Sequence, residues 1–386
     1  MSISNPQVAL LVETSLGSGR EILRGIASFA RQNGSWELFH AARGLDDPVP
    51  EWLENWEGHG IIARIQNEEI AIALKKMNVP IIDVLGVCPT GFPLVHVDDE
   101  KIASRAAAHL WERGFQHFAY FGMKQENWSQ RRQVAFRAAT AKAASFHALE
   151  IGDHAPAHFE TTRLWVSKLP KPAGIMVCSD QRGLLLLEAC RAEGISIPED
   201  IAIVGVDNDT TLCEVAAPSL SSVRGGHARV GFEAARLLNR WIQTGDSPEV
   251  GPHLVSPNEV ITRSSTDSRA VNDPAIRNAM RHIRLHLAEP ITNETIAAAV
   301  GLSRTRFQTR FRKATGLTVR EFLTETRLKR ATQLITSTDL TFADIAERTG
   351  FRHHEYLGYI LKQKMGQTPS ELRRGHLSET EEPRPL

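Results

Sequence analysis

A repeated pattern in the last third of the chain restricts the fold more than any other feature of the sequence. Residues 296–302, IAAAVGL, match residues 345–351, IAERTGF, at an offset of 49. In each copy a short helix is predicted to end at a glycine, Gly301 or Gly350, which can adopt positive φ and turn the chain. The apolar residue after the glycine fills the angle before a second helix begins. Two such copies predict a tandem pair of helix-turn-helix motifs.

The second helix of each copy has one apolar face and one polar face. Its buried side is marked by Phe307 and Phe311 in the first copy and by Leu357 and Leu361 in the second, where the offset has become 50. The opposite side offers groups that bond to phosphates and to base edges in the major groove of DNA. The predicted DNA-binding residues are Ser303 as a helix N-cap, Arg304, Thr305, Arg306, Gln308, Thr309, Arg312, Arg352, His353, His354, Glu355, Tyr359 and Lys362.

Residues 319–337 are predicted to form one long helix between the two motifs, because their apolar positions recur with helical spacing. A rigid spacer of this kind would let the two recognition helices enter successive major grooves, about 34 Å apart. His353, His354 and Glu355 could also suggest a metal site. The chain contains no HExxH motif, so we expect no metal.

Charge is distributed unevenly along the chain. The whole sequence has 45 basic and 45 acidic residues, but residues 275–375 contain 18 Lys or Arg and only 9 Asp or Glu. A basic module attached to an acidic body is typical of nucleic-acid binding, and the expected partner is a double-stranded DNA operator. The alternative is a solvated, charged helical surface.

Residues 7–264 alternate short apolar runs with helical patterns, which is typical of βαβ units around a parallel sheet. There are enough units for two α/β lobes. The predicted organisation is an α/β two-lobed sensor domain at 1–263, a polar linker at 264–274, an all-α tandem helix-turn-helix domain at 275–375 and an acidic tail at 376–386.

Polar residues stand directly after several of the predicted strands. In open α/β sheets, ligands bind beyond the carboxyl ends of the strands. Carboxylate and amide groups there suit a polyhydroxylated ligand, because one carboxylate can accept hydrogen bonds from two neighbouring hydroxyls. A sugar is therefore the expected ligand; the alternative is that these residues only cap the following helices. The candidates are Ser18, Asp83, Asp98, Ser179, Asp180, Asp207 and Asn208.

Several other classes of protein are excluded or disfavoured. Gly17 and Gly19 follow the first strand, but Ile22 stands where a dinucleotide-binding fingerprint needs its third glycine, and no phosphate-binding GxxxxGK[ST] loop occurs. The four cysteines are far apart and are expected to be reduced core thiols. Because neither a secretory signal nor a membrane-spanning run is found, we expect a cytoplasmic protein without a membrane partner. We expect no catalytic activity.

The N-terminal region resembles the effector-binding core of LacI/GalR repressors and periplasmic sugar-binding proteins. The similarity lies in residues 19–26, GREILRGI, residues 204–208, VGVDN, and residues 221–223, SSV. It implies two lobes joined by three crossing strands with the sugar between them. By motif, Arg132 matches a sugar-contacting arginine, and Asp207, Asp83 and Asp180 match acidic residues of the family.

The C-terminal region is similar to the AraC/XylS family, whose ending is present here as residues 366–373, GQTPSELR. Gly358, Tyr359 and Thr309 depart from common residues of that family, so base preference cannot be transferred. The combination of both halves resembles the xylose-operon-regulator family. That resemblance implies D-xylose as effector, no cofactor, a homodimer, contact with RNA polymerase and activation of pentose catabolism genes. Alternatives are another sugar, or a sugar-binding module or enzyme whose helical tail contacts protein.

Overall fold

The computed structural model describes residues 5–34, 36–44, 47–152 and 157–381. The chain divides into two compact units, one ending at Ser268 and the other beginning at Arg269. Among the described residues, no helix is long and apolar enough to cross a membrane. Of the predicted acidic tail, residues 376–381 continue the last helix, and residues 382–386 lie outside the described residues.

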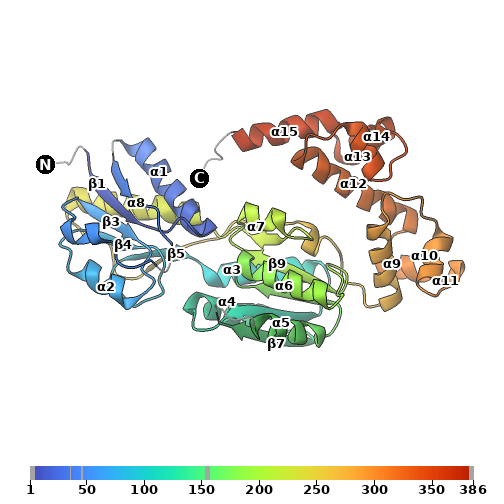
Figure 1. The fold of residues 1–386 in the computed structure, drawn as a ribbon, viewed down its shortest axis with the longest axis horizontal. Helices are drawn as coiled ribbons and strands as arrows, with labels where there is room; N and C mark the ends of the chain where they lie inside the picture. Colours follow the sequence, from blue (N-terminus) through green and yellow to red (C-terminus); the bar gives the residue numbers. More distant parts are fainter. Residues whose placement is uncertain (1–4, 35, 45–46, 153–156, 382–386) are drawn as a thin grey trace. The chain divides into compact units, whose positions relative to one another are not determined.

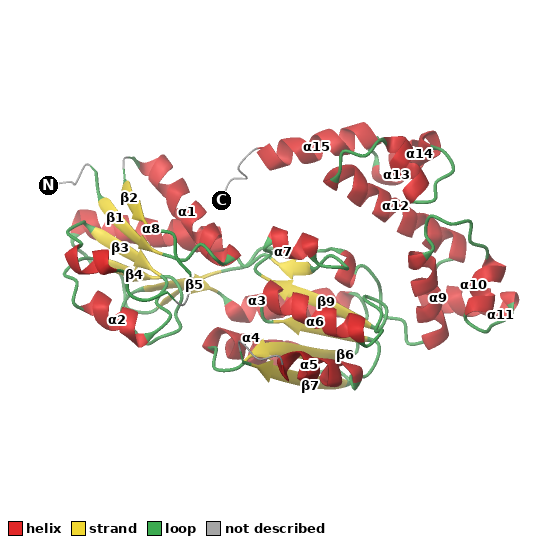
Figure 2. Ribbon diagram, viewed as in Figure 1, coloured by secondary structure: helices red, strands yellow, loops and turns green. Residues whose placement is uncertain are grey.

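The first unit contains two six-stranded sheets, which confirms the predicted two-lobed α/β architecture (Figures 1 and 2). The strand order is β11-β5-β4-β3-β1-β2 in the first lobe and β12-β10-β9-β8-β6-β7 in the second. Described strand pairs are parallel except for β10 with β12. The first lobe has β1 (Gln7–Leu11), β2 (Glu37–His40), β3 (Gly60–Ala63), β4 (Ile81–Asp83), β5 (Leu94–Val97) and β11 (Pro252–Val255). The second has β6 (His117–Met123), β7 (Ser145–Ile151), β8 (Ala173–Val177), β9 (Ile201–Val206), β10 (Ser221–Val223) and β12 (Val260–Ile261).

Helices cover both faces of each sheet, as burial of the central strands requires. In the first lobe α1 (Gly17–Asn33) packs on α8 (His227–Thr244), and α2 (Glu68–Lys75) and the 3-10 helix η1 (Glu51–Asn55) cover the other face. In the second lobe α3 (Asp99–Glu112) packs on α4 (Asn127–Ala139), and α5 (Ala157–Ser167), α6 (Asp180–Ala192) and α7 (Thr210–Val215) contribute to the opposite core.

The chain crosses between the lobes three times, which places the two sets of strand ends beside the same hinge. The crossings lie between β5 and α3, between β10 and α8, and between β11 and β12. Hydrogen bonds join them: the Asp98 amide donates to the Val255 carbonyl at 2.9 Å, and the Asn258 amide donates to the Arg224 carbonyl at 2.9 Å. The hinge is thus a connected set of backbone segments.

The first part of the predicted linker belongs to the first unit. Ser264–Thr266 form a 3-10 helix, η2, in which Ser265 and Thr266 are fully buried. The Ser265 hydroxyl donates to the Ile203 carbonyl at 2.6 Å, and the Thr266 hydroxyl donates to Ser221 Oγ at 2.7 Å. Polar composition suggested a free segment, but these hydroxyls satisfy buried backbone and side-chain groups of the second lobe instead.

The second unit contains seven helices among its described residues, arranged around two small cores. One core joins α9 to α11 and the start of α12, and the other joins the end of α12 to α13, α14 and α15. The helices are α9 (Pro274–Leu285), α10 (Asn293–Ala299), α11 (Arg304–Thr315), α12 (Val319–Ser337), α13 (Phe342–Arg348), α14 (His354–Met365) and α15 (Pro369–Glu381).

The repeat extends beyond the seven matched residues. Gly301 and Gly350 both have positive φ, +67° and +75°, as a tight turn between two helices requires. Gly316 and Gly366 end the two recognition helices in the left-handed conformation. The next helices then begin with matching Thr and Glu capping pairs, Thr318 with Glu321 and Thr368 with Glu371. The predicted tandem helix-turn-helix fold is confirmed.

Candidate functional site

Residues from both lobes meet at the carboxyl ends of their strands, close to the three crossings. From the first lobe come Ser18 in the first turn of α1 and Asp83 at the end of β4. From the second lobe come Arg132 on α4 and the pair Asp207 and Asn208 directly after β9. We call this region the inter-lobe site.

Asp207 is the best-defined anionic group of the inter-lobe site. Its carboxylate accepts a hydrogen bond from Nε2 of His227, on α8 of the other lobe, at 3.0 Å. Burial alone would raise the pKa of Asp207, but the hydrogen bond and charge of His227, with the charges of Arg132 and Arg64, lower it to about 2. Asp207 is therefore ionised throughout the neutral range.

The backbone at this point is strained. Asp207 and Asn208 have φ of +97° and +55°, values that residues with a side chain rarely adopt. β10 holds them there, because the Val223 carbonyl accepts from the Asp207 amide and the Ser222 hydroxyl accepts from the Asn208 amide, each at 3.0 Å. Such strain persists only where the surrounding structure imposes it, and it is concentrated at functional sites.

Arg132 is the buried cation of the second lobe. Its Nε donates to Asp99 at 2.8 Å and its Nη1 donates to the Cys178 carbonyl at 2.6 Å. Its guanidinium also lies 4.9 Å from the centre of the Trp128 ring. Burial would lower the pKa of Arg132, but the charges of Asp99 and Asp207 raise it. The guanidinium is thus held by Asp99, the Cys178 carbonyl and the Trp128 ring, and its charge acts on Asp207.

The first lobe contributes a second buried ion pair. Arg64, which follows β3, pairs with Glu13, which follows β1, and both are at least 90% buried. Nη1 of Arg64 also donates to the Ser18 hydroxyl at 3.1 Å. Asp83 lies nearby and accepts from the Leu85 amide at 2.9 Å; its burial raises its pKa to about 6. Both lobes therefore contribute buried polar and charged groups to the inter-lobe site.

Four buried polar atoms of this region have no hydrogen-bond partner among the described residues. Buried side-chain atoms of this kind are rare in folded proteins, because each unpaired group costs about 1–3 kcal/mol. The inter-lobe site therefore keeps hydrogen-bonding capacity that the described protein groups do not use. The atoms are Oε2 of Glu13, Nε of Arg64, Oδ1 of Asn127 and Oδ1 of Asn208.

The two lobes also contact one another directly around the site. Arg20 on α1 forms an ion pair with Asp209 of the second lobe at 3.1 Å. The side-chain amide of Asn127, at the start of α4, donates to the carbonyls of Gly86 and Val87 in the first lobe, both at 3.0 Å. These side-chain contacts join the lobes in addition to the three crossings.

Three of the predicted effector residues instead support their neighbours. Asp98 caps α3 by accepting from the Lys101 amide, and Ser179 caps α6. Asp180 accepts from the Ser222 hydroxyl at 2.6 Å and from the Asp209 amide at 2.8 Å, and its burial raises its pKa to about 8. The capping alternative thus describes the side chains of Asp98 and Ser179, while Asp180 fixes the loop that carries Asp207.

The predicted set of site residues did not include Glu13, Arg64, Asn127 and His227, and Asp99 was noted only as one of the polar residues that follow a strand. The first three directly follow or lie just beyond β1, β3 and β6, so the rule used for the other candidates could have found them. His227 begins α8 after a crossing, and no local pattern marks its partner. A pocket of about 240 Å³ lies at the first crossing; it is lined by Leu94, His96, Val97, Asp98, Asp99, Glu100, Arg131, Pro252 and Leu254.

In the second unit the structure keeps the predicted DNA-binding face of α11 accessible. Phe307 and Phe311 are fully buried, so the opposite face points outward. Gln308 is half-buried, and the other predicted residues of this face are exposed: Ser303, Arg304, Thr305, Arg306, Thr309 and Arg312.

The equivalent face of α14 is also exposed. It includes an aromatic pair of which only Tyr359 was predicted. Tyr356 and Tyr359 are 46% and 60% exposed, and their rings stack with centroids 6.5 Å apart. The predicted residues of this motif are all exposed: Arg352, His353, His354, Glu355, Tyr359 and Lys362. Oε2 of Glu355 lies 3.4 Å from Nδ1 of His354, and Nζ of Lys362 lies 3.6 Å from Oε2 of Glu371. Among the described residues, no cluster of three potential metal ligands occurs.

The two recognition helices begin differently from their neighbours. α9, α10, α12 and α13 begin with side-chain caps from Asp273, Thr292, Thr318 and Thr341. Ser303 is the N-cap residue of α11, as predicted, but its side chain makes no capping hydrogen bond, and the same holds for His353 of α14. The first backbone N–H groups of both helices therefore remain available as donors to an anion.

Comparison with protein-family models divides the chain into three matched regions. Residues 7–95 match the XylR N-terminal domain, residues 107–266 match a periplasmic binding protein-like domain, and residues 296–375 match a helix-turn-helix domain.

Similar proteins match the chain over nearly its whole length. It is 30% identical to the xylose operon regulatory protein of Escherichia coli strain K12, covering 95% of this chain and 96% of that protein. The protein of the same name from Haemophilus influenzae is 27% identical, covering 95% and 98%. A solved structure described as a xylose-binding transcription activator has a TM-score of 0.82 at 27% identity and covers 97% of this chain and 99% of its own.

Proposed function

Because this chain belongs to the family of the xylose operon regulatory proteins, it is a DNA-binding regulator of transcription rather than an enzyme, and we propose that D-xylose is the effector to which it responds. The observation that carries the proposal is the inter-lobe site. There an ionised Asp207 on strained backbone lies in the field of Arg132 and Arg64, with unpaired polar atoms on both lobes.

A pentose fits the chemistry of these groups. Asp207 can accept hydrogen bonds from two neighbouring sugar hydroxyls, and charge-assisted bonds of this kind are among the stronger ones in proteins. The unpaired atoms of Glu13 and Asn208 can accept from further hydroxyls, and Nε of Arg64 can donate. We assign the sugar contacts to Ser18, Asp83, Arg132, Asp207 and Asn208, together with Glu13, Arg64 and Asn127, and a supporting role to Asp98, Ser179 and Asp180.

The proposed mechanism is linkage between sugar binding and DNA binding. A ligand held by both lobes stabilises the closed form, and it can shift the equilibrium only by as much as it prefers that form. In a homodimer, closure would change the placement of the two DNA-binding units and raise operator affinity or contact with RNA polymerase. Since the operator is in the cytoplasm, we place the protein there.

Calorimetric titration with D-xylose, L-arabinose, D-ribose and D-glucose tests the effector. We expect D-xylose to bind at least tenfold more tightly than the other three. Tighter binding of another pentose would reassign the effector without affecting the assignment of the site, and binding of none would refute a sugar site between the lobes.

Replacing Arg20 by glutamine should weaken sugar binding by up to about fivefold. Arg20 pairs with Asp209 across the lobes, but its side chain is 47% exposed, so the ion pair is worth no more than about 1 kcal/mol. Calorimetric titration measures the change. Arg24→Gln is the matched control, because Arg24 pairs with Glu21 within the same helix. A larger loss in the control than in Arg20→Gln would show that the cross-lobe pair does not favour closure.

Two substitutions on α11 should separate base reading from phosphate binding. Gln308→Ala should change the preferred operator sequence, because glutamine can bond to the edge of adenine. Arg312→Ala should weaken binding to all sequences alike and flatten the salt dependence. Binding titrations with the operator, single-base variants of it and an unrelated duplex measure both effects. The reverse pattern would contradict the assigned face.

A further inference from the structure

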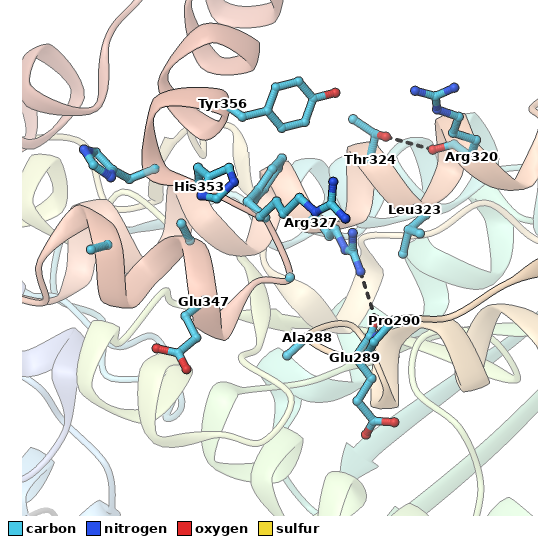
Figure 3. A pocket seen from close by; sticks show the side chains of 16 residues that line it. Ala288, Glu289, Pro290, Arg320, Leu323, Thr324, Arg327, Glu347, His353 and Tyr356 are labelled. Atoms are coloured by element: carbon cyan, nitrogen blue, oxygen red, sulfur yellow. Dashed lines mark hydrogen bonds between the residues drawn. The ribbon is translucent and has the colours of Figure 1, made fainter.

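A groove of about 890 Å³ lies in the DNA-binding unit, between the spacer helix α12 and the second helix-turn-helix motif (Figure 3). One wall is the loop after α9, a second is one face of α12, and the third is the second motif up to the first turn of α14. The residues of α12 that line it are Arg320, Leu323, Thr324 and Arg327. The second recognition face described above supplies one wall of the groove, but the residues of α12 belong to neither recognition face.

The charged residues that line the groove include more arginines than carboxylates. Arg320, Arg327 and Arg352 line it together with His353 and His354, against two carboxylates, Glu289 and Glu347. In Figure 3 both carboxylates lie at the lower side of the view, and Arg320 and Tyr356 lie at the upper side. The surface therefore has a basic edge next to the first turn of the second recognition helix.

Two of the arginines differ in what they can do. Arg327 donates to the Leu287 carbonyl at 3.0 Å and to the Glu289 carbonyl at 3.1 Å, so it ties the loop after α9 to the spacer helix. Arg320 is exposed, and its side chain forms no ion pair with a described residue. Arg327 is thus a positioning residue, and Arg320 is available to an external anion.

The place of Arg320 along the chain indicates which anion this is. α12 separates the recognition helices, since α11 ends at Thr315 and α14 begins at His354. If the two helices occupy successive major grooves, the sugar-phosphate backbone between those grooves passes the spacer. An exposed arginine on the spacer, outside both recognition helices, is placed to neutralise a phosphate of that backbone.

We propose that this groove binds the DNA backbone between the two major-groove contacts, with Arg320 bonded directly to a phosphate. The proposal rests on the DNA-binding function assigned above and adds a contact outside both recognition faces. The contact is independent of base sequence, because every nucleotide offers the same phosphate.

The test compares Arg320→Ala, Arg320→Lys and Arg330→Ala in the full chain with D-xylose present. Arg330 is on the same helix and exposed, but it lies outside the groove and donates to Gln333 instead. Affinities for the operator and for an unrelated duplex are measured by fluorescence anisotropy from low to high salt, and thermal unfolding is measured for each variant.

For Arg320→Ala we expect the slope of log affinity against log salt to fall in magnitude by about 0.9, the value of one phosphate contact, on both duplexes. Arg320→Lys should keep the slope, since it keeps the charge, and Arg330→Ala should match wild type. If Arg320→Ala also matches wild type while wild type binds the operator, the groove proposal is wrong and the DNA-binding function stands. If wild type binds no duplex at any salt, both are wrong.

Discussion

Replacement of Asp207 by asparagine should reduce the affinity for D-xylose by about 100-fold and leave the fold intact. Asparagine has the same shape and tolerates the left-handed backbone that Asp207 adopts at φ +97°. The substitution removes the negative charge that lies beside Arg132 and accepts from His227. Loss of two charge-assisted hydrogen bonds to the sugar costs about 3 kcal/mol, which corresponds to about two orders of magnitude in affinity.

Calorimetric titration measures this loss, and Asp246→Asn is the matched control because Asp246 is exposed beyond the end of α8. The substitution is needed because the pKa of Asp207 is about 2, so its charge cannot be removed by mild acidification. An affinity within threefold of wild type, with unchanged thermal unfolding, would remove Asp207 from the site.

The second large effect is expected at the turn of the second helix-turn-helix motif. Gly350→Ala should destabilise the DNA-binding unit by roughly 3–4 kcal/mol and abolish measurable operator binding. A methyl group at this position would collide with the Leu287 carbonyl oxygen and would lie 2.7 Å from the Arg327 guanidinium, in addition to the strain of φ +75°. The backbone oxygen cannot move without displacing the loop that Arg327 holds.

Gly301→Ala provides the matched control, because Gly301 occupies the same position in the first motif. Its φ of +67° gives a similar backbone strain, but no described atom lies within 4 Å of the added methyl group. We expect a loss of about 1 kcal/mol and near-normal operator binding. Calorimetric unfolding and operator titration measure both variants. Equal effects of the two substitutions would show that the contact at Gly350 does not stabilise the unit.

The sequence predicts the DNA-binding half in detail because its signals are local. The glycines at 301 and 350, the apolar pairs at 307 and 311 and at 357 and 361, and the helical spacing of 319–337 each depend on neighbouring residues only. In the first unit the long apolar strands are predictable for the same reason. β7, β10, β11 and β12 are short, polar or exposed. They therefore lack the apolar run by which the other strands are recognised in the sequence.

The composition of the inter-lobe site is less predictable, because it depends on which strand ends meet. Asp98, Ser179 and Asp207 all follow strands, and only the tertiary structure separates two helix caps from a carboxylate paired with His227. The distance of 20 residues between Asp207 and His227 includes a crossing between lobes. A pair formed across two lobes has no periodic signature.

The proposed mechanism couples sugar binding to operator binding. The most direct test measures operator affinity with and without saturating D-xylose, and D-xylose affinity with and without operator. We expect the sugar to raise operator affinity at least tenfold and the operator to raise sugar affinity by the same factor, as linkage requires. Asp207→Asn should show no such increase at the sugar concentration that saturates wild type. If both ligands bind tightly but neither changes the affinity for the other, sugar binding and operator binding are not coupled.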